Sequence, residues 1–400
     1  MNNYDVSHSG DATLLRKVNE SAILELIQEH GPISRTEVAG RLGLSLTTVT
    51  RIVSLLIDHG LIYVHSSADS SGGRRPILLD FNYRASLIIG VYIQRNMVGA
   101  LADLNGTILH RASAPSQQGE AGIQVLVGLI GELRRKADAL GLPVRGVGVG
   151  APSIVTQPDG FITWAPVLAW RDVPLRRRLE EALGLPVVVQ NEINLLALGE
   201  NWRGAGRGIE NLACISLGAG VGAGLVVNGQ VYNGAHYAAG EIGYLVPGER
   251  FLGRTYDTFG CLESEAGSQG IVRRALAHLA AGEPSALQGQ PALTVDAVLG
   301  AARAGDPLAQ TVVRETVDYL ALAIANLACI VDPERIIITG ELAEFGDLFL
   351  EPIRARIAGL VPATPDIVLS DLRMDATVLG AVAIVMRETS DSLFVQPSRA

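Results

Sequence analysis

The chain has 400 residues, of which 48% are hydrophobic and 18% charged, and its formal net charge is −9. This length predicts two to three domains, and the large apolar fraction excludes a disordered chain. No apolar run reaches the roughly 18–20 residues of a membrane span, and the acidic balance argues against nucleic-acid binding over the whole surface, though not over a part of it.

The distribution of charge indicates two modules, and the cysteine content indicates a reducing compartment. Residues 1–84 hold eight Lys or Arg and nine Asp or Glu, so most of the negative balance lies in the remainder of the chain. A near-neutral head on an acidic body suggests two modules with different partners. Three scattered cysteines are too few for a disulfide framework, and residues 1–10 are too polar for a signal peptide. We therefore expect a cytoplasmic protein.

Two helices are predicted near the start of the chain. The apolar positions of residues 20–30 lie on one helical face, and the pattern stops at Gly31. Ser34, with Glu37 three residues later, forms a capping-box pattern for a second helix, which Gly43 ends.

A third helix is predicted from Ser45, which can cap its start, to Gly60. Two short helices joined by a tight turn behind a packing helix are typical of a helix-turn-helix. Short hydroxyls and an arginine on the outer face of the third helix can reach base edges or phosphates. The candidate DNA contacts of this segment are Ser45, Thr47, Thr48, Thr50 and Arg51. The alternative is an ordinary three-helix bundle with a threonine-rich surface.

A wing is predicted after the third helix. Residues 61–64 and 77–79 resemble two short strands, and the polar loop between them holds Gly73, Arg74 and Arg75. A flexible glycine followed by two arginines suits insertion into a narrow minor groove. The alternative is a solvated linker.

From residue 87 onward the sequence alternates apolar strands with helices, which predicts an α/β body. Strands are expected at 87–93, 98–104, 106–112 and 144–152, within 187–200 and 211–234, and at 334–342 and 367–372; helices are expected at 122–140, 308–330 and 377–386. Two units of this kind with inserted helices suggest two lobes around a cleft.

Two groups of residues in the body suggest ligand binding. The glycine string at residues 217–224 either cradles a phosphate or makes a tight turn. Asn191, Glu192, Glu241 and Glu263 offer amides and carboxylates, which suit sugar hydroxyls because a carboxylate accepts from two hydroxyls and an amide both donates and accepts. Each residue alone is explained as a helix cap or a surface acid, so the prediction depends on their coming together.

These motifs resemble the ROK family of repressors, open reading frames and sugar kinases, within the hexokinase/actin-like superfamily. The matching stretches, spread over residues 85–385, include Gly150-Ala151-Pro152, the segments 165–170 and 191–194, the glycine string, 239–243, 260–263, Asp332-Pro333 and 379–381. The head is similar to that of ROK repressors of the xylose-repressor type through the segments 34–37 and 73–76. This likeness adds Ser34 and Arg35 to the candidate DNA contacts.

The resemblance implies an α/β fold with an N-terminal winged helix-turn-helix and a bilobal, actin-like body. We expect the DNA-binding domain with its wing and linker at residues 1–84, and the effector domain at residues 85–400. One lobe would comprise roughly residues 85–190 with the helix 376–388, and the other residues 191–372.

The chain departs from the family pattern where the kinases hold ATP. Their Asp-x-Gly-Gly-Thr-Lys loop is replaced by Tyr92-Ile93-Gln94-Arg95-Asn96-Met97. Their general base is an aspartate, and here the matching residue is Glu192, whose extra methylene displaces the carboxylate by about 1 Å, which can cost roughly a hundredfold in rate. Both departures argue against a working kinase, so no ATP is expected.

The family's structural zinc motif is also missing. At its positions the chain has Tyr244, Arg254, Tyr256 and Cys261, and one thiol cannot make a four-ligand zinc site. We expect no metal or other cofactor, and we expect Cys261 to be a buried core residue. The absent histidine would have touched the sugar, and Val167 replaces an asparagine. The candidate sugar-binding residues are Asn191, Glu192, Glu241, Tyr244 and Glu263.

The sequence thus predicts a non-enzymatic, sugar-responsive repressor, released from palindromic operator DNA by a monosaccharide or short glycan. Xylose is the first candidate effector and glucose the second, both unphosphorylated because three acidic side chains would repel a phosphate. A two-fold operator implies a homodimer, with a tetramer also open. Two alternatives remain: a sugar kinase with an appended DNA-binding head, and a ligand-independent repressor.

Overall fold

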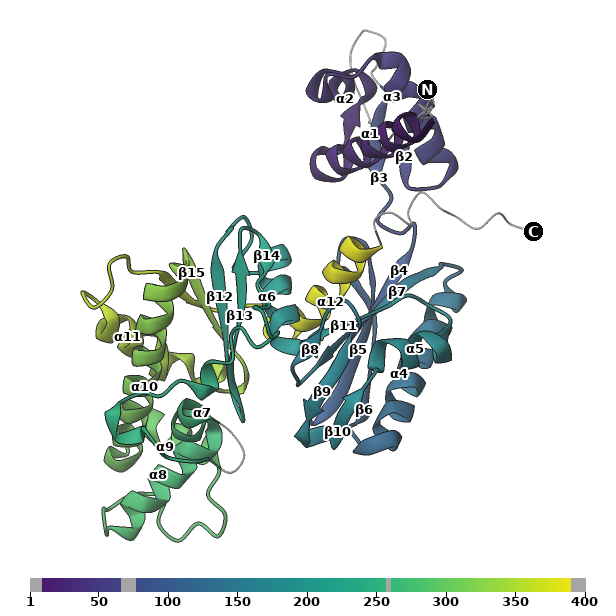
Figure 1. The fold of residues 1–400 in the computed structure, drawn as a ribbon. Coiled ribbons are helices and arrows are strands. Elements are labelled where there is room, and N and C mark those ends of the chain that lie inside the picture. Colours follow the sequence, from purple (N-terminus) through teal and green to yellow (C-terminus); the bar gives the residue numbers. More distant parts are fainter. Residues whose placement is uncertain (1–8, 66–76, 257–259, 390–400) are drawn as a thin grey trace, which may run out of the picture.

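The computed structural model describes residues 9–65, 77–256 and 260–389. Figure 1 shows a small helical head at the N-terminal end of the chain and two larger α/β parts side by side below it. The last helix, α12 (Asp375–Glu388), lies between the two α/β parts and packs on strands of the first. This is the fold class expected from the sequence, a winged helix-turn-helix followed by a bilobal body.

The helices of the head form where the sequence supplies caps. They are α1 (Ser9–His30), α2 (Arg35–Leu42) and α3 (Leu46–Asp58). Ser34 and Glu37 make the complete predicted capping box, and Gly43 ends α2 in the left-handed conformation at φ 65°. Ser45 caps α3 by accepting from the amide of Thr48. The predicted inward positions of α3 are all buried: Val49, Ile52, Val53 and Leu56.

A three-stranded antiparallel sheet completes the head. Its strands β1 (Ile33–Ser34), β3 (Leu78–Phe81) and β2 (Ile62–His65) lie in that order. β2 and β3 are the predicted pair that flanks the wing. The wing loop, with Gly73, Arg74 and Arg75, lies outside the described residues. β1 was not predicted, because a two-residue strand shows no periodicity.

The first α/β part is built on a five-stranded mixed sheet in the order β11-β7-β4-β5-β6. These strands are β4 (Leu87–Ile93), β5 (Asn96–Asp103), β6 (Ile108–Pro115), β7 (Val144–Ala151) and β11 (Val187–Asn191). The helices α4 (Gly119–Ala139) and α5 (Leu175–Leu183) share one apolar core with this sheet. A small antiparallel sheet adjoins it, made of β8 (Val155–Thr156), β9 (Phe161–Ala165) and β10 (Trp170–Val173), with the turn η1 (Pro166–Leu168).

The second α/β part repeats the design with the strand order β14-β13-β12-β15-β16. Its strands are β12 (Leu212–Leu217), β13 (Val221–Val227), β14 (Gln230–Val231), β15 (Arg335–Thr339) and β16 (Asp366–Leu369). Its helices are α6 (Glu192–Arg203), α7 (Cys261–Ala266), α8 (Ser268–Ala280), α9 (Val295–Arg303), α10 (Pro307–Val331) and α11 (Gly346–Ile357), with the short turns η2 (Ile242–Tyr244), η3 (Glu249–Phe251) and η4 (Glu341–Phe345).

Helices α6 and α12 cross at the junction of the two α/β parts with almost no space between their backbones. A Cβ atom added to Gly199 would lie 1.8 Å from the carbonyl oxygen of Ala376, and one added to Gly380 would lie 1.7 Å from that of Leu195. Only glycine permits this approach. The crossing therefore fixes α12 relative to α6, whose first residue is Glu192.

The glycine string is only in part a turn. Residues 218–220 connect β12 to β13, but Gly222 and Gly224 belong to β13 itself. A Cβ on Gly222 would lie 2.4 Å from the Ile193 side chain, and one on Gly224 would lie 2.4 Å from the Ile193 carbonyl oxygen. The single-turn interpretation of the string is therefore wrong for its second half, where the glycines allow α6 to pack closely on the sheet.

Among the described residues, no single helix is long and apolar enough to cross a membrane, although the bent pair α2 and α3 passes that test by length and composition.

Candidate functional site

Three glutamates from separate segments of the body come together. Glu192 is the first residue of α6, directly after β11, Glu241 directly precedes η2, and Glu263 lies on α7. Helix α7 packs against η2, and the charge of Glu241 acts on both other carboxyls. We call these three residues the carboxylate cluster.

Glu192 has the most perturbed carboxyl group of the cluster. Its Oε2 is buried and has no hydrogen-bond partner among the described residues. The pKa of Glu192 is raised to about 8: burial is the largest cause, a backbone hydrogen bond opposes the rise, and the charge of Glu241 adds to it. Because a pKa near 8 keeps the group mostly protonated at pH 7, Glu192 can donate one hydrogen bond as well as accept.

Glu263 is held by one backbone contact. Its Oε2 accepts from the amide of Val221 at 3.0 Å, at the end of the glycine turn, while its Oε1 is buried without a described partner. Burial raises the pKa of Glu263, the Val221 amide lowers it, and the charge of Glu241 raises it. Unpartnered buried oxygens are costly, so Glu192 and Glu263 each present an oxygen that a ligand hydroxyl can satisfy.

The cluster is less negative than a count of its carboxyls suggests. Burial raises the pKa of Glu241 too, as it does for its two neighbours. At pH 7 the three side chains therefore carry fewer than three negative charges, because Glu192 is mostly protonated. The expectation of a fully charged cluster needs this correction, and its repulsion of phosphate is correspondingly weaker.

Asn191 is mainly a helix cap. Its Oδ1 accepts from the amides of Ile193 at 2.8 Å and Asn194 at 3.1 Å, and its Nδ2 donates to the carbonyl of Ser153 at 3.1 Å. One amide hydrogen remains for a ligand. Asn191 therefore caps α6, which is one of the two roles that the sequence allowed. Tyr244, the last residue of η2, is 62% exposed beside the cluster.

A pair of amide contacts near the cluster was not predicted. Asn233, which follows β14, accepts at its Oδ1 from Gln190 of β11 and from Asn194 of α6, each at 3.2 Å. Gln190 and Asn194 are 3% and 4% exposed. The contacts tie the first sheet to the second beside Asn191. No sequence signal could have found Asn233, because it is about 40 positions away from its partners.

The residues at the family's zinc motif do not fit a zinc ion. Cys261 is buried, as expected, and its Sγ lies 2.9 Å from Oη of Tyr256. Burial and this hydrogen bond raise the pKa of Tyr256 to about 12, so its phenol stays neutral. In the described part of the chain, no group of three His, Cys, Asp or Glu residues could hold a metal ion.

The segment in place of the kinase phosphate loop is a tight antiparallel hairpin. Ile93 of β4 pairs with Met97 of β5, and the amide of Gln94 donates to the carbonyl of Asn96. Tyr92 is buried, and burial raises its pKa. This hairpin has no glycine to let a phosphate approach the backbone and no lysine to pair with it.

In the head, the N-terminal part of α3 presents the candidate DNA contacts. Ser45, Thr47, Thr50 and Arg51 are exposed, and Thr48 is half-buried. The hydroxyl of Ser45 contacts Oγ1 of Thr48 at 2.8 Å in addition to capping the helix. This outer face is polar, opposite to the buried apolar face of α3.

The two head residues added by the family resemblance are less accessible. Ser34 is 6% exposed, and its hydroxyl donates to the Glu37 carboxylate at 2.7 Å while accepting from the Glu37 amide. It therefore has no free group for DNA, and its assignment as a DNA contact is corrected to a cap. Arg35 is half-buried, and its Nε is buried without a described partner.

The head and the body share an apolar core. Residues of α1, α3 and the head sheet cluster with Ile88, Val188, Val382 and Val385 of the body. A cavity of about 350 Å³ lies in this contact and is lined by Leu24, Gln28, Phe81, Leu104, Trp202, Met386 and neighbouring residues. The C-terminal part of α12 thus contacts the DNA-binding head.

Two family models match the chain. The ROK family model matches residues 89–388, and a winged helix-turn-helix DNA-binding model matches residues 18–63. The matches cover the body and the head separately.

The similar proteins include regulators and enzymes. The xylose repressor of Caldicellulosiruptor bescii is 29% identical over 95% of this chain and 98% of its own length. A glucokinase of Halalkalibacterium halodurans is 38% identical, over 65% of this chain and 80% of its own length. The crystal structure of a ROK family transcriptional regulator, a homologue of the Escherichia coli Mlc protein, has a TM-score of 0.83 at 27% identity, covering 95% of this chain and 98% of that one.

Proposed function

The chain belongs to the ROK family, and on this premise we propose that it is a sugar-responsive, DNA-binding transcriptional repressor of carbohydrate genes. The observation that carries the proposal is the union in one chain of a winged helix-turn-helix with a sugar-kinase-like body. Full-length similarity to a xylose repressor supports it, since the match spans both parts.

The mechanism we propose is linkage between two sites. Sugar binds at the carboxylate cluster, the two α/β parts close on it, and the placement of the heads becomes unfavourable for operator binding. Such a coupling is typically about 1–3 kcal/mol. We propose a homodimer on a palindromic operator, because a two-fold DNA site matches a two-fold protein. We also propose that the protein is cytoplasmic.

For the effector we propose an unphosphorylated monosaccharide or short glycan, with xylose and glucose as first candidates. Asn191, Glu192, Glu241, Tyr244 and Glu263 are the proposed contacts. The two buried, unpartnered oxygens of Glu192 and Glu263 support this assignment, because hydroxyl donors would satisfy them. The Arg51 face of α3 and the wing arginines Arg74 and Arg75 are the proposed DNA contacts.

We further propose that the body has no kinase activity and uses neither ATP nor zinc. The glycine-free hairpin at residues 92–97 and the neutral Tyr256 beside Cys261 support this proposal. The competing candidate is a sugar kinase with an added DNA-binding head, and similarity to a glucokinase over 65% of the chain favours it.

One experiment tests the repressor proposal. Operator fragments are selected from a random DNA pool with the full-length protein, and binding is followed by fluorescence anisotropy at fixed salt while xylose, glucose and their phosphates are added. Release by a free sugar is expected. Failure to select any DNA sequence would contradict the proposal.

A second experiment addresses catalysis. ATP consumption is measured with the same sugars, and no turnover is expected from the wild-type chain or from Glu192→Asp, because the phosphate loop is absent in both. Turnover with any sugar would establish the kinase alternative.

A further inference from the structure

Helix α7 holds Glu263, but it is too short to fix its own position. It has six residues between Gly260 and Gly267, and no side chain caps its start. A helix of this length is not stable in isolation. The placement of Glu263 therefore depends on what packs and bonds against α7.

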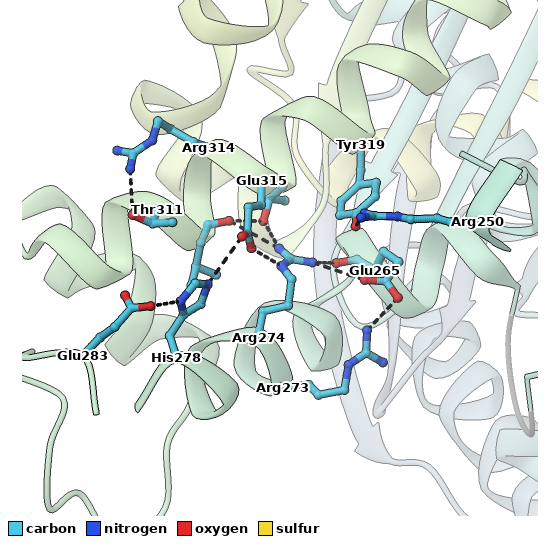
Figure 2. A network of polar contacts seen from close by, with 12 residues as sticks. Arg250, Glu265, Arg273, Arg274, His278, Glu283, Thr311, Arg314, Glu315 and Tyr319 are labelled. Atoms are coloured by element: carbon cyan, nitrogen blue, oxygen red, sulfur yellow. Dashed lines mark hydrogen bonds and ion pairs between the residues drawn. The ribbon is translucent and has the colours of Figure 1, made fainter. Parts of the chain in front are cut away.

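Arg274 of α8 makes a polar contact with the C-terminal end of α7 (Figure 2). Its guanidinium donates to the carbonyl of Glu265 on α7, and also to the hydroxyl of Thr316 and, at 3.3 Å, to the carbonyl of Val312, both on α10. Its Nε lies 3.0 Å from Glu315 Oε2 as an ion pair. One side chain thus joins α7 to the long helix α10.

The surroundings of Arg274 are buried, and its two terminal nitrogens make the hydrogen bonds, whereas among the described residues Nε has only the ion pair with Glu315. Its side chain is 12% exposed, and Thr316 is fully buried and donates to the Val312 carbonyl at 2.8 Å. The ring of Tyr319 lies 5.5 Å from the guanidinium carbon of Arg274. The Tyr319 hydroxyl accepts a hydrogen bond from Arg250 of η3. Removing the guanidinium would leave the Glu265 carbonyl and the Thr316 hydroxyl without this donor in a buried place, which is costly.

We propose that Arg274 is a positioning residue for effector binding: it ties the last turn of α7 to α10 and thereby holds Glu263 in place beside the Val221 amide. This inference rests on the proposed function, because it takes Glu263 as an effector contact. Arg274 itself does not touch the effector.

Arg273, the preceding residue, is a matched control. It has the same charge and pairs with the Glu265 carboxylate (Figure 2), at 2.9 Å, but its side chain is 56% exposed. Exposed ion pairs contribute little. Among the described residues its recorded partner is Glu265 alone, so Arg273→Gln removes a charge beside α7 without cutting the tie to α10.

The test compares full-length Arg274→Gln, Arg274→Lys and Arg273→Gln with the wild type. Three quantities are measured: operator affinity without sugar, the xylose and glucose concentrations for half-release, and amide hydrogen exchange of residues 261–267. For Arg274→Gln we expect a tenfold or greater rise in the sugar concentration, operator affinity within twofold of wild type, and faster exchange in α7. Arg274→Lys should recover only part of the response, and Arg273→Gln should match the wild type.

The proposal would be overturned if Arg274→Gln were released at the wild-type sugar concentration, or if its α7 exchanged at the wild-type rate. It would also be overturned if operator affinity fell by the same factor as sugar response, because that indicates general damage to the protein. If Arg274→Gln does not fold, Thr316→Val removes one partner of the guanidinium instead. We expect a threefold or greater rise in the midpoint and faster α7 exchange, and no change in either would overturn the proposal. If neither sugar releases wild-type protein, the effector assignment fails, while the exchange comparison still decides the role of Arg274.

Discussion

Burial changes what a carboxyl group contributes at the scale of single residues, and Glu192 is the clearest case. Its pKa is raised to about 8 from the ordinary value of 4.5. Between these two pH values the folded chain holds a proton that the unfolded chain has lost. The free energy of unfolding therefore falls as pH rises through this window. This loss of stability comes with leaving Oε2 of Glu192 unpartnered, which is the oxygen that we propose for a sugar hydroxyl.

Glu192→Gln tests this account, since the amide mimics the protonated carboxyl. The variant and the wild type should have similar free energies of unfolding near pH 4.5, and the variant should be more stable by about 3–5 kcal/mol near pH 8.5, since each unit of pKa shift corresponds to about 1.4 kcal/mol. Urea unfolding across this range measures the difference. Glu181→Gln, at an exposed position of α5, is the control for removing a carboxylate at the surface. A flat profile for Glu192→Gln would contradict the raised pKa.

The charge of Glu241 acts on both other carboxyls, which makes Glu241 the best single target for the effector site. Glu241→Ala should abolish release by xylose or glucose while operator affinity stays within about twofold, because Glu241 lies in the body and the proposed DNA contacts lie in the head. Anisotropy titrations with and without sugar measure both quantities. Glu249→Ala, on the exposed turn η3, is the control. Release of Glu241→Ala at the wild-type sugar concentration would refute the site, and tighter binding of a sugar phosphate would refute the effector class.

Arg51 is the candidate base-reading residue of α3. Arg51→Ala should weaken operator binding by about 1–3 kcal/mol and relax discrimination at one position of the site. Binding is measured at fixed salt on the operator and on single-base variants, because lost phosphate contacts also change the salt dependence. Arg135→Ala removes an exposed arginine of α4, in the body, and should have no effect. An equal affinity of Arg51→Ala and wild type for every variant would exclude base contact.

At the scale of elements, the sequence predicted features that depend on neighbouring residues, and it did not predict contacts between residues far apart in the chain. The caps of α2 and α3 were read from residues three positions apart, and they are present as predicted. Strand β1 was not predicted, because its two residues show no periodicity and its partner β3 lies some 45 positions later. The Arg274 contacts escaped for the same reason, since they join residues up to 42 positions apart. Among the site residues, the sequence identified the three glutamates but not Asn233.

The crossing of α6 and α12 gives a prediction about elements. Gly199→Ala should destabilise the protein by about 1–3 kcal/mol or more, because its Cβ would meet the backbone of Ala376 at 1.8 Å and the helices must separate. Gly128→Ala, in α4 with nothing within 4 Å of its Cβ, should instead stabilise by about 0.5–1 kcal/mol. Chemical unfolding of both variants measures this. Equal stabilities would show that the crossing is not closely packed in solution.

At the scale of the whole molecule, α12 connects the two proposed sites. It crosses α6, which begins at Glu192, and its C-terminal residues Val382 and Val385 share a core with the head. The sequence predicted a helix at residues 377–386 but did not predict what its glycine does. The structure shows that Gly380 allows the close crossing and that the later residues contact the head. A shift of α6 on sugar binding would therefore move α12, and with it the residues on which the DNA-binding head packs.

This connection makes a reciprocal prediction. If sugar weakens operator affinity by some factor, operator DNA must weaken sugar affinity by the same factor, which we expect to lie between about 5-fold and 150-fold. Calorimetric sugar titrations with and without operator, set beside DNA titrations with and without sugar, measure both factors. Met386→Ala, which enlarges the cavity between head and body, should bring both factors toward one while each separate affinity changes little. Leu140→Ala, at an exposed site of the body, should leave both at wild type. A Met386→Ala protein with undiminished coupling would show that sugar acts on the head by another route than α12.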